Sequence, residues 1–309
     1  MDTFAVFQQM LILVFVIAVG FSIRRMGIIN EDTNAHLTKL ILSVTMPATL
    51  LSALSGSTLE VPLRNAFILL GIVTLAHLFM IAIACLSPFA LRADKSDRGV
   101  LATMALFGNA TFIGIPLAYA FFGPDGMFYT LLLNIVNNLF LFSLGMKLVG
   151  GSRAKLSIKF FLSPVLISAV LAVTLFLANI QLPFVINSGL RLIGSITTPA
   201  AMILLGSTLG AIEFGELFRG WRVYAITAVR LLIIPVSVFY FLVFISATIF
   251  PLSTLFLRVA IVIVASPMAV STVTFAIHYG ANKELASKGI LLSTLFSVIT
   301  MPFLLTVLT

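Results

Sequence analysis

Long apolar segments separated by short polar ones make up nearly the whole chain. Each segment has about the 20 residues that a helix needs to cross the hydrocarbon core of a bilayer, and glycine, proline or charged residues separate it from the next. We therefore expect an all-α polytopic membrane protein without a soluble domain. The pattern predicts ten transmembrane helices, at residues 4–23, 34–55, 65–90, 98–122, 127–149, 157–179, 187–211, 221–246, 254–278 and 286–308.

The composition agrees with this pattern. Of the 309 residues, 61% are hydrophobic and 9% are charged, whereas about 25% of the residues in a soluble domain are charged. Residues 1–9 lack the basic residues that begin a cleavable signal peptide, so the first segment is expected to be a retained span. The net charge of +8 does not indicate a nucleic-acid partner, because no basic patch is interleaved with aromatic residues. The lipid bilayer is the expected environment.

Basic residues predict the orientation in the membrane. If ten spans alternate, only Arg64, Arg191 and Arg258 lie on one side, and Arg230 lies inside a span. The positive-inside rule makes the other side cytoplasmic. Both termini are then extracytoplasmic, in a plasma membrane such as the bacterial inner membrane. The 14 residues expected on the cytoplasmic side are Arg24, Arg25, Lys39, Arg92, Lys95, Arg98, Lys147, Arg153, Lys155, Lys159, Arg219, Arg222, Lys283 and Lys288.

Two pairs of prolines indicate an internal repeat. Pro47 and Pro199 are 152 residues apart, and Pro116 and Pro267 are 151 residues apart. Because a repeat of five spans is odd, its second copy enters the membrane in the opposite orientation, an arrangement common in secondary transporters. We expect a first five-helix repeat at residues 1–150 and a second, inverted one at residues 151–309. The alternative is that the prolines match by chance, since membrane helices often contain proline.

The fourth and ninth spans are interrupted near their middles, at residues 106–116 and 266–278. Proline removes a backbone donor and glycine admits a close neighbour, so both helices are expected to be broken. In hydrocarbon the freed backbone groups need protein, water or a ligand as partners. If the broken helices cross at the membrane midplane, their N-terminal ends favour an anionic substrate. For a single hydroxyl, repair of its own backbone is the alternative. The candidate binding residues are Asn109, Thr111, Gly114, Pro116, Ser266, Pro267, Ser271 and Thr272.

The fifth span carries four polar side chains on one helical face. Thr130, Asn134, Asn137 and Asn138 are spaced at i, i+4, i+7 and i+8, which places them on the same side of a helix. Asparagine is costly in a membrane helix unless it meets a partner, so this face is expected to point inward. The three asparagines are candidate substrate ligands. Structural hydrogen bonding between helices is the alternative.

Arg230 and His77 are ionisable residues that lie away from the ends of their predicted spans. Arg230 is a candidate anion ligand, because a guanidinium binds a carboxylate through two parallel hydrogen bonds. The alternative is that its long side chain extends to the cytoplasmic interface. His77, near the centre of the third span, is a candidate for proton coupling. Its alternative is a neutral imidazole that forms a hydrogen bond between helices.

The acidic residues lie outside the centres of the predicted spans. All ten Asp and Glu residues fall in loops or at span ends, so no buried carboxylate is expected to carry a proton or neutralise a sodium ion. Carboxylate-based cation antiport is therefore not expected. Neither a cofactor nor a metal site is expected, and coupling to Na⁺ stays open. An intramembrane enzyme is not expected, because the chain has no HExxH motif and no pair of intramembrane aspartates.

Five motifs occur in order along the whole chain: TMPATLLSAL, GNATFIGIPLAYAFFG, TTPAAMILLGSTLG, SPMAVSTVTFAIHYG and LLSTLFSVITMPFL. Together they resemble the auxin efflux carrier family, which includes bacterial malonate and malate permeases and plant auxin exporters. The resemblance implies a fold shared with bile-acid symporters. Spans 1, 2, 6 and 7 would form a scaffold, spans 3–5 and 8–10 a transport domain, and spans 4 and 9 would cross at their broken centres.

The resemblance also implies where the substrate binds and where this chain departs from its relatives. The family's crossover prolines correspond to Pro116 and Pro267, and its crossover asparagine to Asn109. Substrate would bind beside the crossing, on the side of the scaffold. Many relatives have an asparagine shortly after the second proline, where this chain has Ser271 and Thr272. The long hydrophilic central loop of many plant members is absent from the sequence.

These observations together predict a secondary transporter. We expect a carrier that moves a small organic anion, such as malonate, malate or an auxin-like carboxylate, by an elevator-type alternating-access mechanism. An anion channel or a ligand-sensing membrane protein on the same fold is the alternative. The substrate, the direction of transport and the oligomeric state are open, including a homodimer formed through the scaffold.

Overall fold

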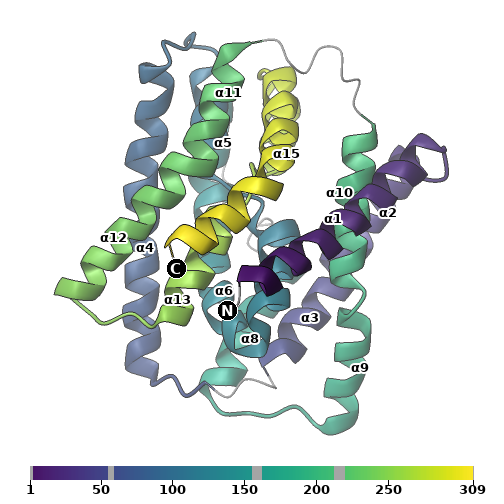
Figure 1. Cartoon of the computed structure of the whole chain (residues 1–309), viewed down its shortest axis with the longest axis vertical. Coiled ribbons are helices and arrows are strands. Elements are labelled where there is room, and N and C mark those ends of the chain that lie inside the picture. Colours follow the sequence, from purple (N-terminus) through teal and green to yellow (C-terminus); the bar gives the residue numbers. More distant parts are fainter. Residues whose placement is uncertain (1–2, 55–58, 155–161, 212–219, 309) are drawn as a thin grey trace. The chain divides into compact units, whose positions relative to one another are not determined.

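Helices occupy the predicted apolar segments in the computed structural model (Figure 1). The structure describes residues 3–54, 59–154, 162–211 and 220–308. Within them it contains helices and one isolated β-bridge, so the expectation of an all-α protein is confirmed. The α-helices are α1 (Thr3–Arg25), α2 (Glu31–Leu40), α3 (Met46–Ala53), α4 (Leu63–Ala90), α5 (Arg98–Leu106), α6 (Ile115–Phe140), α7 (Met146–Gly150), α8 (Pro164–Leu177), α9 (Phe184–Gly194), α10 (Thr197–Gly210), α11 (Trp221–Ala228), α12 (Ile234–Thr248), α13 (Thr254–Val264), α14 (Ser271–Tyr279) and α15 (Lys283–Leu308). Short π segments are η1 (Ile41–Thr45), η3 (Ala110–Gly114), η4 (Leu141–Gly145) and η8 (Val229–Ile233), and η5 (Gly151–Arg153) is a 3₁₀ turn.

Several helical stretches have the length and apolar character of membrane spans. Helices α8 and α13 are also apolar, but with 14 and 11 residues they are shorter than a membrane span usually is. The ten-span count, the inverted repeat and the orientation of the termini stay predictions. Among the described residues, five stretches are long and apolar enough to cross a membrane: Leu63–Ala90, Ala110–Arg153, Phe184–Gly210, Trp221–Thr248 and Lys283–Leu308.

The boundary between the fourth and fifth predicted spans is a kink inside α6. Gly123 has φ 58° and ψ −153°, and Pro124 follows it. Residues with a side chain rarely adopt this positive φ, so glycine is the residue that the turn requires. The predicted spans end at 122 and begin again at 127, on either side of this kink.

The sixth predicted span begins earlier than its helix. The prediction starts at residue 157, whereas α8 starts at Pro164; residues 155–161 are outside the described part of the chain. Ser163 is the N-cap, and its side chain accepts a hydrogen bond from the N–H of Leu166. Proline suits the first helical position because its missing N–H would have no partner there. Hydropathy alone does not locate such a start.

Three of the four π segments in the described residues end two positions before a proline. Pro47 follows η1, Pro116 follows η3 and Pro235 follows η8. Proline has no N–H to donate and its ring clashes with the preceding turn. Widening the helix by one residue accommodates both effects, and π turns of this kind are often found at functional sites. One of them, η8, contains Arg230.

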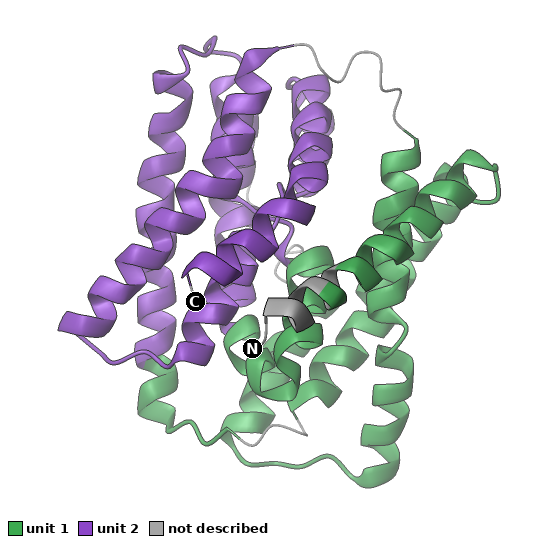
Figure 2. Cartoon of the chain, in the orientation of Figure 1, with its two compact units in different colours: residues 1–67, 111–131, 159–213 green, residues 68–110, 132–158, 214–309 purple. Residues whose placement is uncertain are grey.

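The chain forms two compact units (Figure 2). Unit 1 comprises Met1–Phe67, Thr111–Leu131 and Lys159–Glu213. In unit 1, α1 packs along α10, and α3 packs against α8 and α9. Gly206 and Gly210 form a GxxxG motif on α10 that lets the backbone of α1 approach closely. The hydroxyl of Thr49 pairs with the carbonyl oxygen of Gly194 at 2.9 Å and with the hydroxyl of Thr197 at 2.8 Å.

Gly206→Ala is expected to destabilise unit 1. A Cβ atom at Gly206 would overlap the carbonyl oxygen of Ile17, which is rigid backbone. Overpacking of this kind costs about 1–3 kcal/mol, so the Tm of the detergent-solubilised protein should fall. Gly189→Ala on α9 is the matched control, because a Cβ there has no atom within 4 Å. Equal melting temperatures for the two variants would contradict the close packing of α1 and α10.

Unit 2 comprises Ile68–Ala110, Leu132–Ile158 and Phe214–Thr309. Within it, α15 contacts α5, α11 and α13, and α14 packs against α7 and α15. Gly99 on α5 lies so close to the backbone of Leu148 that a Cβ would overlap its carbonyl oxygen. This packing buries α5 and α13 almost completely along their last turns. The two helices that end at the predicted interruptions therefore belong to one unit.

Candidate functional site

The first interruption is a short extended segment after α5. The helix ends at Leu106, and Phe107 has φ −104° and ψ 122°, which is extended backbone. Helical turns resume at Ala110. Phe107 and Asn109 are 0% and 7% exposed, so the opened backbone is buried and its polar groups need partners.

The second interruption supplies those partners. Gly108 forms an antiparallel bridge with Met268. The N–H of Asn109 donates to the carbonyl oxygen of Pro267 at 2.6 Å, and the N–H of Ala269 donates to that of Phe107 at 2.9 Å. We call residues 107–109 and 267–269 the paired segment. Its two halves hydrogen-bond to each other as in a β-ladder, and these bonds provide the partners that backbone groups need in an apolar environment.

The tenth predicted span completes this hydrogen bonding. The N–H of Met268 donates to the hydroxyl of Ser293 on α15 at 3.0 Å. Gly289, one turn earlier, leaves room for the side chains of Met104 and Met268, since a Cβ at this glycine would overlap both. Neither the hydrogen bond from the N–H of Met268 to Ser293 nor the role of Gly289 was predicted from the sequence. The small residues of the span, spaced one turn apart, were the available signal.

Arg230 lies against the carbonyl ends of α5 and α13. Its side chain is 1% exposed, so it does not extend to the cytoplasmic interface as the alternative prediction had it. Each of its three guanidinium nitrogens donates to backbone carbonyl oxygens at 2.8–3.2 Å. The acceptors are Ala105 and Leu106 at the end of α5, Val264 at the end of α13, and Ser266 just after α13. A carboxylate would have to compete with these bonds, and binding of an anion by Arg230 stays a prediction.

Gly108 makes room for this arginine. A Cβ built on Gly108 would overlap the Nη2 atom of Arg230 and the hydroxyl of Ser266. Glycine is thus required by the close approach of the guanidinium to the paired segment. The Ser266 hydroxyl itself donates to the carbonyl oxygen of Ile263 at 2.7 Å, which is the self-repair expected as the alternative for hydroxyls in this region.

The remaining candidates of the ninth span lie at the start of α14. Pro267 accepts the hydrogen bond from Asn109. Ser271 is half-buried, whereas Thr272 is 0% exposed and its hydroxyl has no hydrogen-bond partner. An unpaired buried hydroxyl costs free energy unless water or a ligand meets it. Thr272 is therefore the candidate in this span with an unused polar group.

Thr111, Gly114 and Pro116 belong to unit 1. Thr111 is half-buried, while Gly114 and Pro116 are buried. All three follow the paired segment directly along the chain, in η3 and the first turn of α6. Their role as substrate ligands stays a prediction.

The asparagines of the fifth span lie in unit 2, on the second part of α6. Asn134, Asn137 and Asn138 are 0%, 6% and 8% exposed. The Nδ2 atom of Asn138 donates to Oδ1 of Asn134 at 2.8 Å. The hydroxyl of Thr130 donates to its own helix, at the carbonyl oxygen of Gly126. This polar face of α6 is therefore buried, and two of its asparagines are hydrogen-bonded to each other.

A double-mutant cycle separates structural pairing from substrate binding on this face. Asn134→Ala leaves the Asn138 amide without its acceptor and is expected to cost about 1–3 kcal/mol. Adding Asn138→Ala should recover part of that loss, with a coupling of about 0.5–1.5 kcal/mol, the net contribution of a typical hydrogen bond. Unfolding in detergent measures the stabilities, and flux in liposomes measures function. If the double variant is stable and still transports, the pair is structural only.

His77 is buried inside unit 2, where its ring makes a hydrogen bond and an aromatic contact. It is 3% exposed, and Nδ1 lies 2.9 Å from the carbonyl oxygen of Val73, one turn earlier on α4. A carbonyl can only accept, so Nδ1 carries the proton in this contact. The ring stacks on Phe140 with centroids 5.8 Å apart. The hydrogen bond therefore runs along its own helix rather than between helices, and a role in proton coupling stays a prediction.

No acidic side chain among the described residues is buried. Seven acidic residues are described, of which Asp97 and Asp125 are half-buried and the other five are exposed. The described acids are Glu31, Asp32, Glu60, Asp94, Asp97, Asp125 and Glu284. Asp2, Glu213 and Glu216 lie outside the described residues, as do Lys155, Lys159 and Arg219 of the predicted cytoplasmic set.

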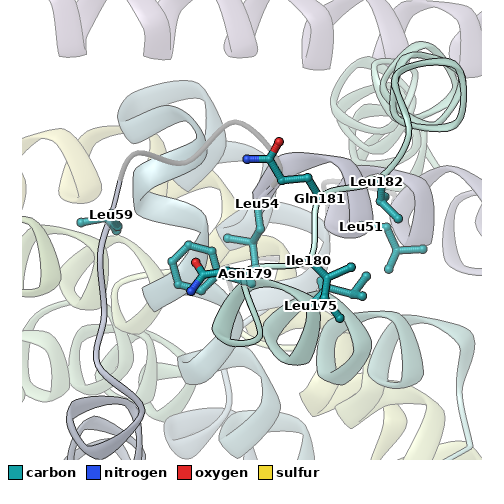
Figure 3. A pocket seen from close by; sticks show the side chains of 10 residues that line it. Leu51, Leu54, Leu59, Leu175, Asn179, Ile180, Gln181 and Leu182 are labelled. Carbon is teal, nitrogen blue, oxygen red and sulfur yellow. The ribbon is translucent and has the colours of Figure 1, made fainter.

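Unit 1 contains a separate pocket that is lined mainly by apolar residues. It lies between α3, α8 and the segment that follows α8, and leucines make up much of its lining (Figure 3). Leu51, Leu54 and Leu175 are among them, and Asn179 and Gln181 supply the polar groups. No charged side chain lines it. None of the predicted site residues contributes to this pocket.

Comparison with known proteins identifies relatives along nearly the full length. A family model described as membrane transport protein matches residues 5–305. An uncharacterized transporter of the archaeon Methanocaldococcus jannaschii is 26% identical over 305 residues, covering 94% of each chain. An uncharacterized transporter of Methanothermobacter thermautotrophicus is 22% identical over 306 residues, covering 96% of each chain.

Proposed function

The chain belongs to the membrane transport protein family, that of the auxin efflux carriers, and on this premise we propose that it is a secondary carrier of a small organic anion. The observation that best supports an anionic substrate is that helical structure starts shortly after each half of the paired segment. Helical turns begin at Ala110, one residue after it, and α14 begins at Ser271, two residues after it. Helix N-termini carry a partial positive charge and expose N–H groups, which favours an anion.

The charges of the described residues support an anion over a cation. No described carboxylate is buried, whereas a cation carrier of this size usually needs one to neutralise its cargo. Uncharged donors lie close to the helix starts along the chain: the amide of Asn109, the hydroxyl of Thr111 and the unpaired hydroxyl of Thr272. We propose Asn109 and Thr272, which both belong to unit 2, as ligands, with Ser271 shaping the site and the asparagine face of α6 contributing further.

We further propose an elevator-type mechanism in which unit 2 moves as a body. The division of the chain supports this proposal, because unit 2 holds the paired segment, Arg230 and α15. Predicted spans 1, 2 and 7 lie in unit 1, as does the described part of span 6, which is where the family resemblance places the scaffold. Residues 111–131 also belong to unit 1, so the boundary differs from a division between whole spans.

Flux into proteoliposomes tests the carrier. Purified protein is reconstituted, and uptake of radiolabelled malonate, malate and indole-3-acetate is followed over a range of concentrations. A carrier should show a saturating initial rate for at least one of these anions, and unlabelled substrate should compete. Flux that rises linearly with concentration would favour a channel. Binding in a thermal-shift screen without any flux would favour a ligand sensor.

A further inference from the structure

The C-terminal ends of α5 and α13 present backbone carbonyls that their own helices leave unpaired. The last four carbonyls of an α-helix lack an intrahelical partner, and together they carry about half a negative charge at each helix end. Both ends are buried in unit 2: Leu106 is 0% exposed and Val264 is 5% exposed. Buried carbonyls with negative potential form a site for a cation, and half-helix ends coordinate coupling ions in other secondary transporters.

We infer that these two helix ends form a guanidinium-binding site, and that Arg230 fills it from within the chain as a permanent cation. The arginine joins the two ends, since Nη1 donates to Ala105 and Leu106 at 3.2 and 2.9 Å, and Nη2 donates to Val264 and Ser266 at 2.8 and 3.0 Å. The Nε–H also donates to Ser266, at 3.1 Å. Five bonds use the five N–H groups that a guanidinium possesses.

The electrostatic balance explains why a charged side chain is stable although it is buried. Two helix ends of about −0.5 each offset one positive charge. Arg230 takes no part in the ion pairs Arg24–Glu31, Arg222–Asp94 and Lys288–Glu284. Its five hydrogen bonds go to backbone carbonyls, so carbonyl dipoles offset its charge. The planar guanidinium group of arginine reaches the carbonyls of both helix ends at once, whereas a compact cation such as an ammonium or Na⁺ reaches fewer of these oxygens.

This arrangement makes Arg230 a positioning residue. It holds the ends of α5 and α13 together just before the paired segment, and therefore fixes where the helices after Asn109 and Ala269 begin. The π turn η8 contributes by placing this side chain two turns after the start of α11. The site is a property of unit 2 alone, and it does not depend on the proposed transport activity.

Chemical rescue of an emptied site tests the inference. Arg230→Ala removes the guanidinium and leaves the carbonyls open, so the Tm in detergent should fall by about 10 °C. Millimolar methylguanidinium should restore several degrees of that loss, whereas equal concentrations of NaCl or methylammonium chloride should not. Arg222→Ala is the matched control, because this arginine lies on the same α11–η8–α12 stretch but pairs with the exposed Asp94; its Tm should not respond to methylguanidinium.

Arg230→Lys gives a second measurement if the alanine variant does not fold. Lysine keeps the charge but offers three donors from one nitrogen, so its Tm should lie below that of the wild type and should rise with methylguanidinium less than the alanine variant does. The wild-type Tm should be the same in NaCl and choline chloride. An alanine variant as stable as the wild type would overturn the inference. So would rescue by Na⁺ equal to that by methylguanidinium, or a lysine variant indistinguishable from the wild type.

Discussion

Gly108→Ala should abolish transport and destabilise the protein by about 3 kcal/mol, the upper part of the range for overpacking a close-packed interior. The added Cβ would overlap the Nη2 atom of Arg230 and the hydroxyl of Ser266. Neither group can shift without loss of hydrogen bonds, because Nη2 donates to two carbonyls and the hydroxyl donates to a third. The added methyl group therefore disturbs both the hydrogen bonds of Arg230 to the ends of α5 and α13 and the paired segment.

Thermal unfolding in detergent and flux in liposomes measure this effect. Gly71→Ala on α4 is the matched control, since a Cβ at this exposed glycine meets no atom within 4 Å. The control should keep both its Tm and its flux. A Gly108→Ala protein with the Tm and flux of the wild type would show that Arg230 does not lie against this glycine.

Two substitutions at Asn109 should separate the role of its backbone from that of its side chain. Asn109→Pro removes the N–H that donates to Pro267 at 2.6 Å and leaves a buried carbonyl unpaired. A proline where a buried hydrogen-bonded N–H is needed costs about 3 kcal/mol or more, so this variant should lose both stability and flux. Asn109→Ala keeps the backbone bond and should retain its Tm within a few degrees, while its flux falls at least tenfold.

The comparison of the two Asn109 variants is informative in each direction. If Asn109→Pro is as stable as the wild type, the paired segment does not hold the two interruptions together. If Asn109→Ala transports at the wild-type rate, the side chain of Asn109 is not a ligand for the substrate. Comparing Tm with flux for the same proteins excludes a loss of function that comes only from unfolding.

Glycines and prolines lie where helical segments end or bend, because their effect on the backbone is local. Gly108 and Pro267 lie in the paired segment, and Gly123 with Pro124 marks the kink in α6. That the fourth and ninth predicted spans are broken membrane helices stays a prediction. The π turns before Pro47, Pro116 and Pro235 follow from the same missing N–H. The spacing of Asn134 and Asn138 likewise predicted neighbours on one helical face, and their amides do form a hydrogen bond.

The partners across the interruptions could not be predicted from the sequence in this way. Arg230 is 124 residues from Leu106 and 36 from Ser266 along the chain, and no periodicity relates such distant positions. The intramembrane charge indicated a functional residue, but only the fold shows that its partners are carbonyls. The hydroxyl of Ser293 meets the N–H of Met268 for the same reason: tertiary packing of α15, not local spacing, brings the two together.

Counterflow in proteoliposomes tests the proposed carrier most directly. Vesicles are preloaded with a high concentration of an unlabelled carboxylate that gave saturable flux, and diluted into a trace of the same anion in labelled form, with the membrane potential clamped to zero. A carrier that alternates between two faces should accumulate label transiently above its external concentration, and Asn109→Ala should lose this overshoot. Label that only equilibrates, with or without preloading, would contradict a carrier and indicate a channel.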